Sequence, residues 1–323
     1  CLQRGIFSHT DLIIGLPEES YDSFAEGISQ VIAMGQHNDI LFHNASILPN
    51  AEMANPEYQQ EHGIQLLSIP FPGHTSIDMI QESIDVIIGT RTANTNDWVK
   101  MQSLAWMTNF LYFTFKPMQI AFMVLHHEIG LSYRELIESF CLSKAQATHP
   151  VVTQIYLTML NLAQRYAAGE EWPKDNPLFF SPQEGIHLTP DHMIQRHLAQ
   201  QGLWSQFYKE AENLLLQRAY RKQSQIDMSL FQDALKLSQA HFYHHFFGQL
   251  EHESSSQEMG VYELQLRYNL WDFYEAQMRG LNCPIKKEAT RFKHMAPRSL
   301  MGQTIYSEQP GHTYPQSELN NAR

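Results

Sequence analysis

The sequence predicts an α/β fold for its first part and an all-α fold for the part that follows. Strand and helix patterns alternate over residues 1–90, only helix signals are evident after residue 92, and the alternating part holds two or three strands. A parallel sheet that small is not stable without further strands. We therefore expect residues 1–90 to be the closing part of an α/β sheet or barrel whose opening strands come earlier in the intact protein.

The α/β part opens with an apolar strand at residues 10–16, which reads as buried on both faces, as in a parallel sheet covered by helices. A helix capped by Ser20 follows, and further strands are predicted at residues 39–48 and 64–69, on either side of a short helix near residues 56–62. A second long amphipathic helix is predicted after them. The apolar stripes of the two long helices are Tyr21, Phe24, Ile28, Val31 and Ile32 in the first, and Ile77, Ile80, Ile84 and Ile87 in the second.

Helix start signals dominate residues 91–283, which we expect to be an all-helical domain. Ser132 and Glu135 have the spacing of a capping box, and Thr189-Pro190 places a cap residue before a proline in the first helical turn. Apolar stripes predict further helices that begin at Pro150 and that span residues 203–221, 228–250 and 257–279. Residues 284–323 have little apolar periodicity, so we expect a poorly ordered tail.

One apolar segment, WMTNFLYFTFKPMQIAFMVL at residues 106–125, has about the ~20 residues that a membrane-spanning helix needs. Asn109 and the Lys116-Pro117 pair lie inside it, and a lysine at the centre of a bilayer is costly. Proline is well tolerated in the first turn of a helix. We therefore predict two buried core helices, one ending near Phe115 and one beginning at Pro117, and no membrane span.

Charge and cysteine usage exclude several classes of protein. The 22 basic and 34 acidic residues give a net charge of −12, which disfavours binding to nucleic acid or anionic lipid. Cys1, Cys141 and Cys283 lie too far apart for a local metal motif, and their odd number argues against a disulfide framework. With no visible signal peptide, a cytoplasmic location is expected. Because the chain begins at Cys1 and enters a strand almost at once, we expect a fragment of a longer protein.

The stretch DLIIGLPEES at residues 11–20 is a predicted strand–turn–helix junction, and it is the main candidate for a functional site in the sequence. Ligands of α/β proteins bind outside the carboxyl ends of strands, and Gly15 allows a close approach of backbone to a ligand. Pro17 fixes one dihedral angle of the turn, and acidic residues suit the positive end of the next helix. The residues alone favour a well-made turn with capping acids, and a ligand-binding turn is the alternative.

Three segments resemble the radical S-adenosylmethionine (SAM) superfamily. DLIIGLPEESYDSFAEGI, from residue 11, is similar to the fifth-strand segment of that family, with its Gly-Leu-Pro turn and amphipathic helix. ASILPNAEMANPEYQQEHGI, at residues 45–64, is similar to the sixth-strand segment that follows. RTANTNDWVKMQSLAW, at residues 91–106, fits the subgroup that has a cobalamin-binding domain ahead of the barrel and a helical C-terminal region. The resemblance covers residues 1–135.

The chain departs from the family pattern in two ways. Glu18 stands where the family usually has Gly, and Asn50 stands where Gly is common. The Cys-x3-Cys-x2-Cys motif that holds a [4Fe-4S] cluster is absent from the chain, so its ligands would precede Cys1. The resemblance thus implies the C-terminal part of a SAM- and iron–sulfur-dependent, cobalamin-assisted, methyltransferase-like enzyme, with cobalamin on an upstream domain and with this part alone inactive.

The resemblance also implies where SAM would bind. The expected partners are a small-molecule substrate and the upstream domains of the same protein, and the resemblance names no catalytic residue and no metal ligand in the chain. The residues implied to border SAM are Ile13, Gly15, Pro17, Glu18, Asn44, Leu48 and Pro49.

Two other classes stay open. The chain could be a non-catalytic helical interaction or scaffold protein with an α/β edge. It could also be a zinc enzyme, because HFYHHFF places His241 and His245 one helical turn apart. The same helix face continues with apolar residues, which favours packing as the role of these histidines.

Overall fold

The computed structural model describes residues 7–70, 83–144, 147–170, 180–181, 186–187, 189–222, 225–250 and 259–297. These residues form two compact units. One unit, here called the sheet unit, comprises residues 8–109 and 132–197; the other, the hairpin unit, comprises residues 110–131 and the described residues from 198 onward. The predicted division of the chain near residue 90 stays a prediction.

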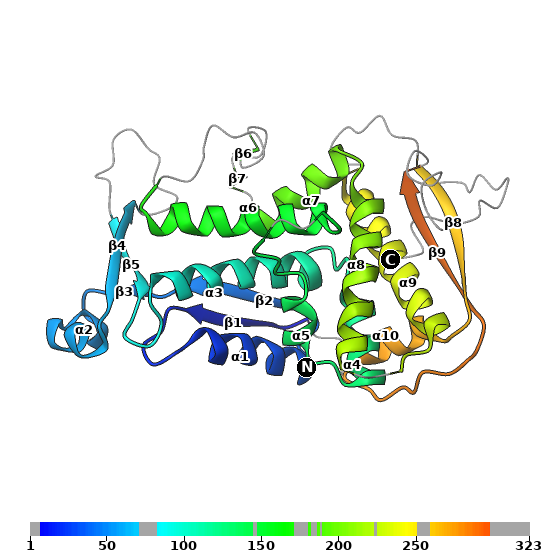
Figure 1. Cartoon of the computed structure of the whole chain (residues 1–323), viewed down its shortest axis with the longest axis horizontal. Coiled ribbons are helices and arrows are strands. Elements are labelled where there is room, and N and C mark those ends of the chain that lie inside the picture. Colours follow the sequence, from blue (N-terminus) through cyan, green and yellow to red (C-terminus); the bar gives the residue numbers. More distant parts are fainter. Residues whose placement is uncertain are drawn as a thin grey trace. The chain divides into compact units, whose positions relative to one another are not determined.

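The sheet unit begins with a parallel strand pair joined by a helix (Figure 1). These elements are β1 (His9–Ile14), α1 (Tyr21–Ala33) and β2 (Asp39–Asn44), and β1 pairs with β2 from His9↔Asp39 to Ile14↔Asn44. The side chain of Ser20 caps α1 and forms a capping box with Ser23. The predicted first strand, cap and helix are therefore confirmed, and the strand predicted at residues 39–48 is confirmed for Asp39–Asn44.

The next three strands form a separate antiparallel sheet, in the order β3-β5-β4. The elements of this part are β3 (Ser46–Ile47), the short 3-10 helix η2 (Glu52–Ala54), α2 (Pro56–His62), β4 (Gln65–Pro70) and β5 (Ser83–Gly89). The helix and the strand predicted near residues 56–62 and 64–69 are confirmed. The series of parallel strands that the sequence suggested does not continue beyond β2, because β3 and β4 both pair with β5 in the antiparallel sense.

The prediction of a helix through Ile84 and Ile87 is wrong, because both residues lie in β5. The run SIDVIIG is rich in β-branched residues, which favour the extended backbone. Cross-strand pairing with β4, including Ile69↔Ile84, adds the contacts that helical spacing alone did not anticipate. Ile77 and Ile80 lie outside the described residues.

Helices complete the sheet unit. α5 has the predicted capping box between Ser132 and Glu135, and α7 begins at Pro190 as predicted. α3 packs against α6, and Trp98 at the start of α3 stacks on Tyr166 near the end of α6. The elements are α3 (Thr95–Thr108), α5 (Tyr133–Glu138), α6 (Pro150–Ala167), β6 (Phe180–Ser181), β7 (Ile186–His187) and α7 (Pro190–Gln200), whose end belongs to the hairpin unit.

The hairpin unit combines helices with two long antiparallel strands that are separated in sequence by residues 267–289, so the expectation of an all-helical region is wrong for residues 259–266. The run VYELQL alternates with period two, and β8 and β9 pair from Met259↔Pro297 to Leu266↔Thr290. Part of the predicted tail is therefore the strand β9. The elements are η3 (Asn109–Phe113, which starts in the sheet unit), α4 (Gln119–Ile129), α8 (Trp204–Arg221), α9 (Met228–Leu250), β8 (Met259–Leu266), α10 (Leu270–Met278) and β9 (Thr290–Pro297).

The apolar segment at residues 106–125 is interrupted as predicted. The π-helical η3 ends at Phe113, Phe115 and Lys116 have left-handed backbones, and α4 then begins at Gln119. Every residue of α4 from Gln119 to Leu125 is buried. In the part of the chain that the structure describes, no helix is both long enough and apolar enough to cross a membrane.

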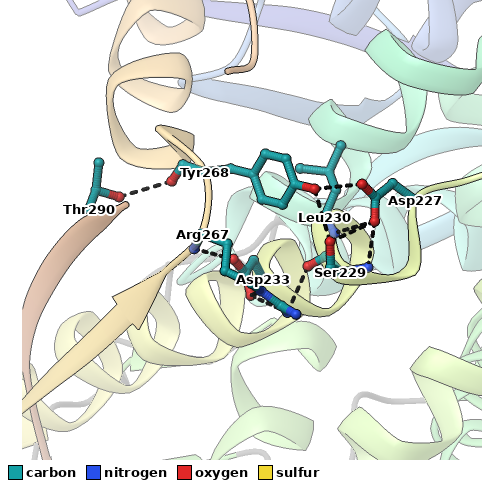
Figure 2. A network of polar contacts seen from close by, with 7 residues as sticks. All are labelled: Asp227, Ser229, Leu230, Asp233, Arg267, Tyr268 and Thr290. Carbon is teal, nitrogen blue, oxygen red and sulfur yellow. Dashed lines mark hydrogen bonds and ion pairs between the residues drawn. The ribbon is translucent and has the colours of Figure 1, made fainter. Parts of the chain in front are cut away.

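A polar network joins the start of α9 to the chain that leaves β8 (Figure 2). The Asp227 carboxylate accepts hydrogen bonds from the backbone N–H and the hydroxyl of Ser229, at 2.8 and 2.6 Å. The Arg267 guanidinium pairs with the buried Asp233 carboxylate at 2.7 Å. Thr290, at the start of β9, donates to the Tyr268 carbonyl at 2.9 Å. The network fixes the β8–β9 strand pair to the N-terminal turn of α9.

Candidate functional site

The two faces of the β1–β2 pair differ in their environment. Successive strand residues point to opposite faces, and Ile14 and Ile40, on the face toward α1, are fully buried. Phe24 of α1 and Phe42 of β2 contact each other there, with ring centroids 6.1 Å apart. One face of the pair is therefore part of the core of the sheet unit.

The opposite face is here called the open face; its exposed residues are His9, Asp11, Ile13, Leu41 and His43, and the half-buried Asp39 lies on the same side. Ile13 is 44% exposed and Leu41 is 38% exposed. Parallel sheets in α/β proteins are usually covered on both faces, so exposed apolar side chains here are a departure from the rule. The expectation that the first strand is buried on both faces is wrong in the described structure.

Polar side chains of the open face contact one another. His43 Nε2 lies 2.9 Å from Asp11 Oδ1, and His9 Nε2 lies 3.8 Å from Asp11 Oδ2. The three side chains are about half exposed, at 56%, 54% and 53% for His43, Asp11 and His9. A carboxylate flanked by two imidazoles therefore lies beside the apolar patch of Ile13 and Leu41.

The turn after β1 owes its shape to Gly15, which has φ 92° and is buried. A Cβ at this position would lie 3.0 Å from the Ile87 carbonyl oxygen and 3.3 Å from Trp98 Cδ1. Glycine is thus required by the backbone dihedral and by close packing against β5 and α3. Pro17 is half-buried in the same turn, and Glu18 is exposed with a left-handed φ of 69°.

Asn44, the last residue of β2, lies on the face toward α1 rather than on the open face, because it pairs with Ile14. Its Oδ1 and the Nε1 of Trp98 are both buried without a hydrogen-bond partner. Burial raises the pKa of Tyr166, and a side-chain hydrogen bond with Asn44 opposes that rise. Buried donors and acceptors without a hydrogen-bond partner are uncommon in proteins.

Glu19 carries a third buried and unpartnered polar atom, its Oε2. Burial raises the pKa of this carboxyl. Thr92 donates a hydrogen bond to the Glu19 carbonyl at 2.8 Å, which fixes the backbone of the turn. The cap of α1 is Ser20, so neither acid of the turn supplies the side-chain cap.

The residues implied to border SAM therefore fall into three places. Ile13 lies on the open face, the Gly15 turn lies at its carboxyl end, and Asn44 points toward the helices. Leu48 and Pro49 follow β3 and are exposed, with Leu48 at 62%. Their contact with SAM stays a prediction, and the register brings Ile13 beside His43 rather than beside Asn44.

Sequence reasoning did not identify the Asp11–His43 pair or the Trp98–Tyr166 stack. Asp11 and Ile13 have the two-residue spacing of one strand face, which is the signal that was available. The position of His43 beside them depends on the register of β2 against β1, which a single sequence does not specify. The Trp98–Tyr166 contact joins residues far apart in sequence, so no local pattern indicates it.

Cysteines and histidines do not assemble a metal centre in the described residues. Among those residues, no three His, Cys, Asp or Glu side chains are grouped so that they could hold a metal ion. Burial and the nearby Glu138 raise the pKa of the Cys141 thiol, which disfavours the thiolate that binds iron. The chain's own described residues therefore do not fit an iron–sulfur cluster, and we assign no reaction step to one here.

The histidine pair that suggested zinc is buried among aromatic rings. His241 and His245 have ring centroids 4.5 Å apart, and His241 also contacts Trp271 and Tyr274. Burial, with the charges of His245, Lys116 and His244, lowers the pKa of His241. The zinc interpretation stays an untested alternative.

The β1–α1–β2 unit places the Gly15 turn at the carboxyl end of a parallel strand, which is where ligands of α/β proteins commonly bind. No protein-family model matches the chain. Two curated proteins, both methyltransferases by name, are similar to it in sequence. The predicted resemblance to the cobalamin-type radical SAM proteins is confirmed by these similarities.

The first relative is the 2-(S-pantetheinyl)-carbapenam-3-carboxylate methyltransferase of Streptantibioticus cattleyicolor, 29% identical over 196 residues. The second is the cobalamin-dependent radical SAM methyltransferase TokK of Streptomyces tokunonensis, 26% identical over 191 residues. Each match covers 58% of this chain and 28% of the relative. The matched part of the chain thus spans less than a third of the length of either relative.

Proposed function

We propose that the chain is part of a radical SAM enzyme of the methyltransferase-like, cobalamin-assisted kind, and that the open face is part of the wall of its reaction cavity. The observation that carries the proposal is the similarity to two curated methyltransferases, one of which is named as cobalamin-dependent and radical SAM. The cluster ligands and the cobalamin domain would then belong to other parts of the intact protein, which is the expected partner of this chain.

The open face has the composition of a ligand-binding wall. Ile13 and Leu41 supply exposed apolar surface, and Asp11 and His43 supply hydrogen-bonding groups beside it. Binding sites for small molecules combine mostly apolar walls with a few placed polar groups. In the intact protein, SAM and a cluster held by other parts of the polypeptide would supply a carbon radical. The role of the chain's own residues is to orient the reactants and to exclude water from that radical.

The test uses the intact reading frame that encodes this chain, purified without oxygen and supplied with iron, sulfide and cobalamin. The assay contains SAM tritiated in its methyl group, a reductant, and a deproteinised small-molecule extract of the cells that make the protein. We expect formation of 5′-deoxyadenosine and cobalamin-dependent transfer of tritium to a small molecule. A colourless, iron-free protein that cleaves no SAM would instead support the scaffold alternative.

A matched pair of variants tests whether the open face is the cavity wall. Ile13→Arg places a charge on the open face and removes apolar protein surface that would contact the ligand. We therefore expect it to lower 5′-deoxyadenosine formation about tenfold or more. Met34→Arg adds the same charge at a residue that is 87% exposed after α1, and we expect wild-type activity. Equal activity of the two variants would show that the open face does not border the reaction.

A further inference from the structure

Asp11 is positioned to hold the ring of His43 in one orientation. Ile13 pairs with His43 across the parallel strands, so Asp11 is the diagonal neighbour of His43 on the open face. The contact joins His43 Nε2 and Asp11 Oδ1 at 2.9 Å. His9 reaches the other carboxylate oxygen only at 3.8 Å, which is longer than a hydrogen bond.

The carboxylate determines which nitrogen of the ring carries hydrogen. An ionised Asp only accepts hydrogen bonds, so the Nε2 of His43 is the donor in the contact with Asp11. In the neutral imidazole the other nitrogen, Nδ1, is then an acceptor. A carboxylate that orients an imidazole in this way is a recurring device of functional sites.

Stability does not explain the pair. Both side chains are more than half exposed, and exposed ion pairs contribute little to folding. The face of a parallel sheet is normally apolar, yet here it carries a carboxylate between two imidazoles next to Ile13 and Leu41. Polar groups placed in this way beside an apolar surface favour recognition of a ligand over packing.

We propose that His43 binds the small-molecule substrate, with its Nδ1 accepting a hydrogen bond from an N–H or O–H group of that substrate, and that Asp11 is the positioning residue that keeps Nδ1 an acceptor. The inference rests on the proposed function, because it takes the open face as the cavity wall. The substrate would then present a hydrogen-bond donor next to an apolar portion to this wall.

Four variants separate recognition from structure. His43→Gln keeps one N–H for Asp11 and one oxygen acceptor for the substrate, whereas His43→Phe keeps neither. Asp11→Ala removes the carboxylate that contacts His43 Nε2, so the ring of His43 loses its fixed orientation. Met34→Phe is the control, since it adds the same ring at a residue that is 87% exposed after α1 and lies outside the open face. All four changes are at half-exposed or exposed positions, so we expect unchanged melting temperatures.

The measurement is tritium transfer by the intact enzyme as a function of the amount of extract, together with 5′-deoxyadenosine formation without extract. At limiting extract we expect His43→Phe to lower transfer about 10- to 100-fold and Asp11→Ala about tenfold, as lost hydrogen bonds to buried ligand groups do. His43→Gln and Met34→Phe should stay within about threefold of wild type. Saturating extract should restore most of the rate, and SAM cleavage without extract by Met34→Phe should equal that of the wild type.

Two results would overturn the inference while leaving the proposed function intact. One is wild-type transfer by His43→Phe at limiting extract. The other is an equal loss in His43→Gln and His43→Phe accompanied by lower melting temperatures, which is the signature of a structural role. An intact wild-type protein that cleaves no SAM would overturn the proposed function, and this inference with it.

Discussion

Gly15 and Glu18 both have left-handed backbones in the turn after β1, with φ 92° and φ 69°. Only Gly15 is a glycine, and only Gly15 is closely packed, against Ile87 and Trp98. Non-glycine residues in this region of backbone space are strained by roughly 1–2 kcal/mol. Glu18 therefore stores strain at the turn where SAM is predicted to bind, at the position where the family pattern has Gly.

We expect Glu18→Gly to raise the free energy of unfolding of the chain by about 1 kcal/mol, because it relieves the left-handed strain. Urea denaturation measures this change. Glu18→Ala is the matched control: it removes the same carboxylate but keeps a Cβ, so we expect no stabilisation. A gain of equal size in both variants would show that the carboxylate, rather than the backbone, is the source of strain.

At the site, the sequence predicts the local features of single residues but not their neighbours in space. The turn chemistry at Gly15 and Pro17 and the cap at Ser20 are local, so short patterns predicted them. The neighbours of Ile13 are not local. His43 reaches the open face through strand register, and Trp98 reaches Gly15 through helix packing, and neither follows from spacing along one strand.

At the scale of the element, the errors have one physical cause. Helical and strand periods are hard to distinguish in short apolar runs, so pairing with a neighbouring strand decides which secondary structure such a run adopts. The run at Ser83–Gly89 became a strand because β4 lies beside it, and Met259–Leu266 became a strand because it pairs with Thr290–Pro297. Long helices such as Met228–Leu250, with no comparable strand partner, were predicted correctly.

The histidines of α9 and β9 predict a loss of stability in acid. Burial, together with nearby His244, lowers the pKa of His294 from 6.5 to about 4, and burial lowers the pKa of His241 well below 6.5. The unfolded chain therefore binds more protons than the folded chain between about pH 6.5 and pH 4. Stability is present above this window and falls as the pH falls through it, by about 1.4 kcal/mol per pH unit for each histidine.

Urea denaturation between pH 7.5 and pH 4.5 measures this dependence. We expect His294→Leu, which removes one titrating ring from a residue that is 1% exposed, to reduce the slope by about one proton equivalent. A slope equal to that of the wild type would show that His294 is protonated as readily in the folded chain as in the unfolded chain.

The network at the start of α9 yields a second prediction at this scale. Asp233 is 1% exposed, and its carboxylate is paired with Arg267, whose side chain is 47% exposed. Arg267→Leu leaves a buried carboxylate without its cation, so we expect it to lower the free energy of unfolding by about 2–3 kcal/mol. Breaking a fully buried pair costs more, and the exposure of Arg267 reduces the loss.

The double variant Asp233→Leu with Arg267→Leu is the control for this prediction. Removing both charges leaves no unpaired ion, so we expect the double variant to be more stable than Arg267→Leu alone. Urea denaturation of the three proteins measures the coupling. A double variant less stable than the single one would show that the backbone N–H bond from Arg267 to Asp233 carries most of the stabilisation.

For the whole molecule, the matches to curated relatives cover part of the chain, and the two compact units do not simply follow one another along the sequence. Each match spans 58% of this chain but 28% of a relative. The units interleave along the sequence: residues 110–131 belong to the hairpin unit, although residues of the sheet unit lie before and after them. Division at one point in the sequence therefore does not reproduce the compact units.

That interleaving constrains how the protein can be taken apart. Cutting the chain once, anywhere between residues 110 and 197, leaves at least one unit divided between two polypeptides. Such halves should be poorly folded alone and should regain structure when expressed together, as in split-protein complementation. For directed evolution, the same feature means that exchanging the C-terminal part with a homologue at a single crossover between residues 110 and 197 would also disturb the sheet unit that carries the open face.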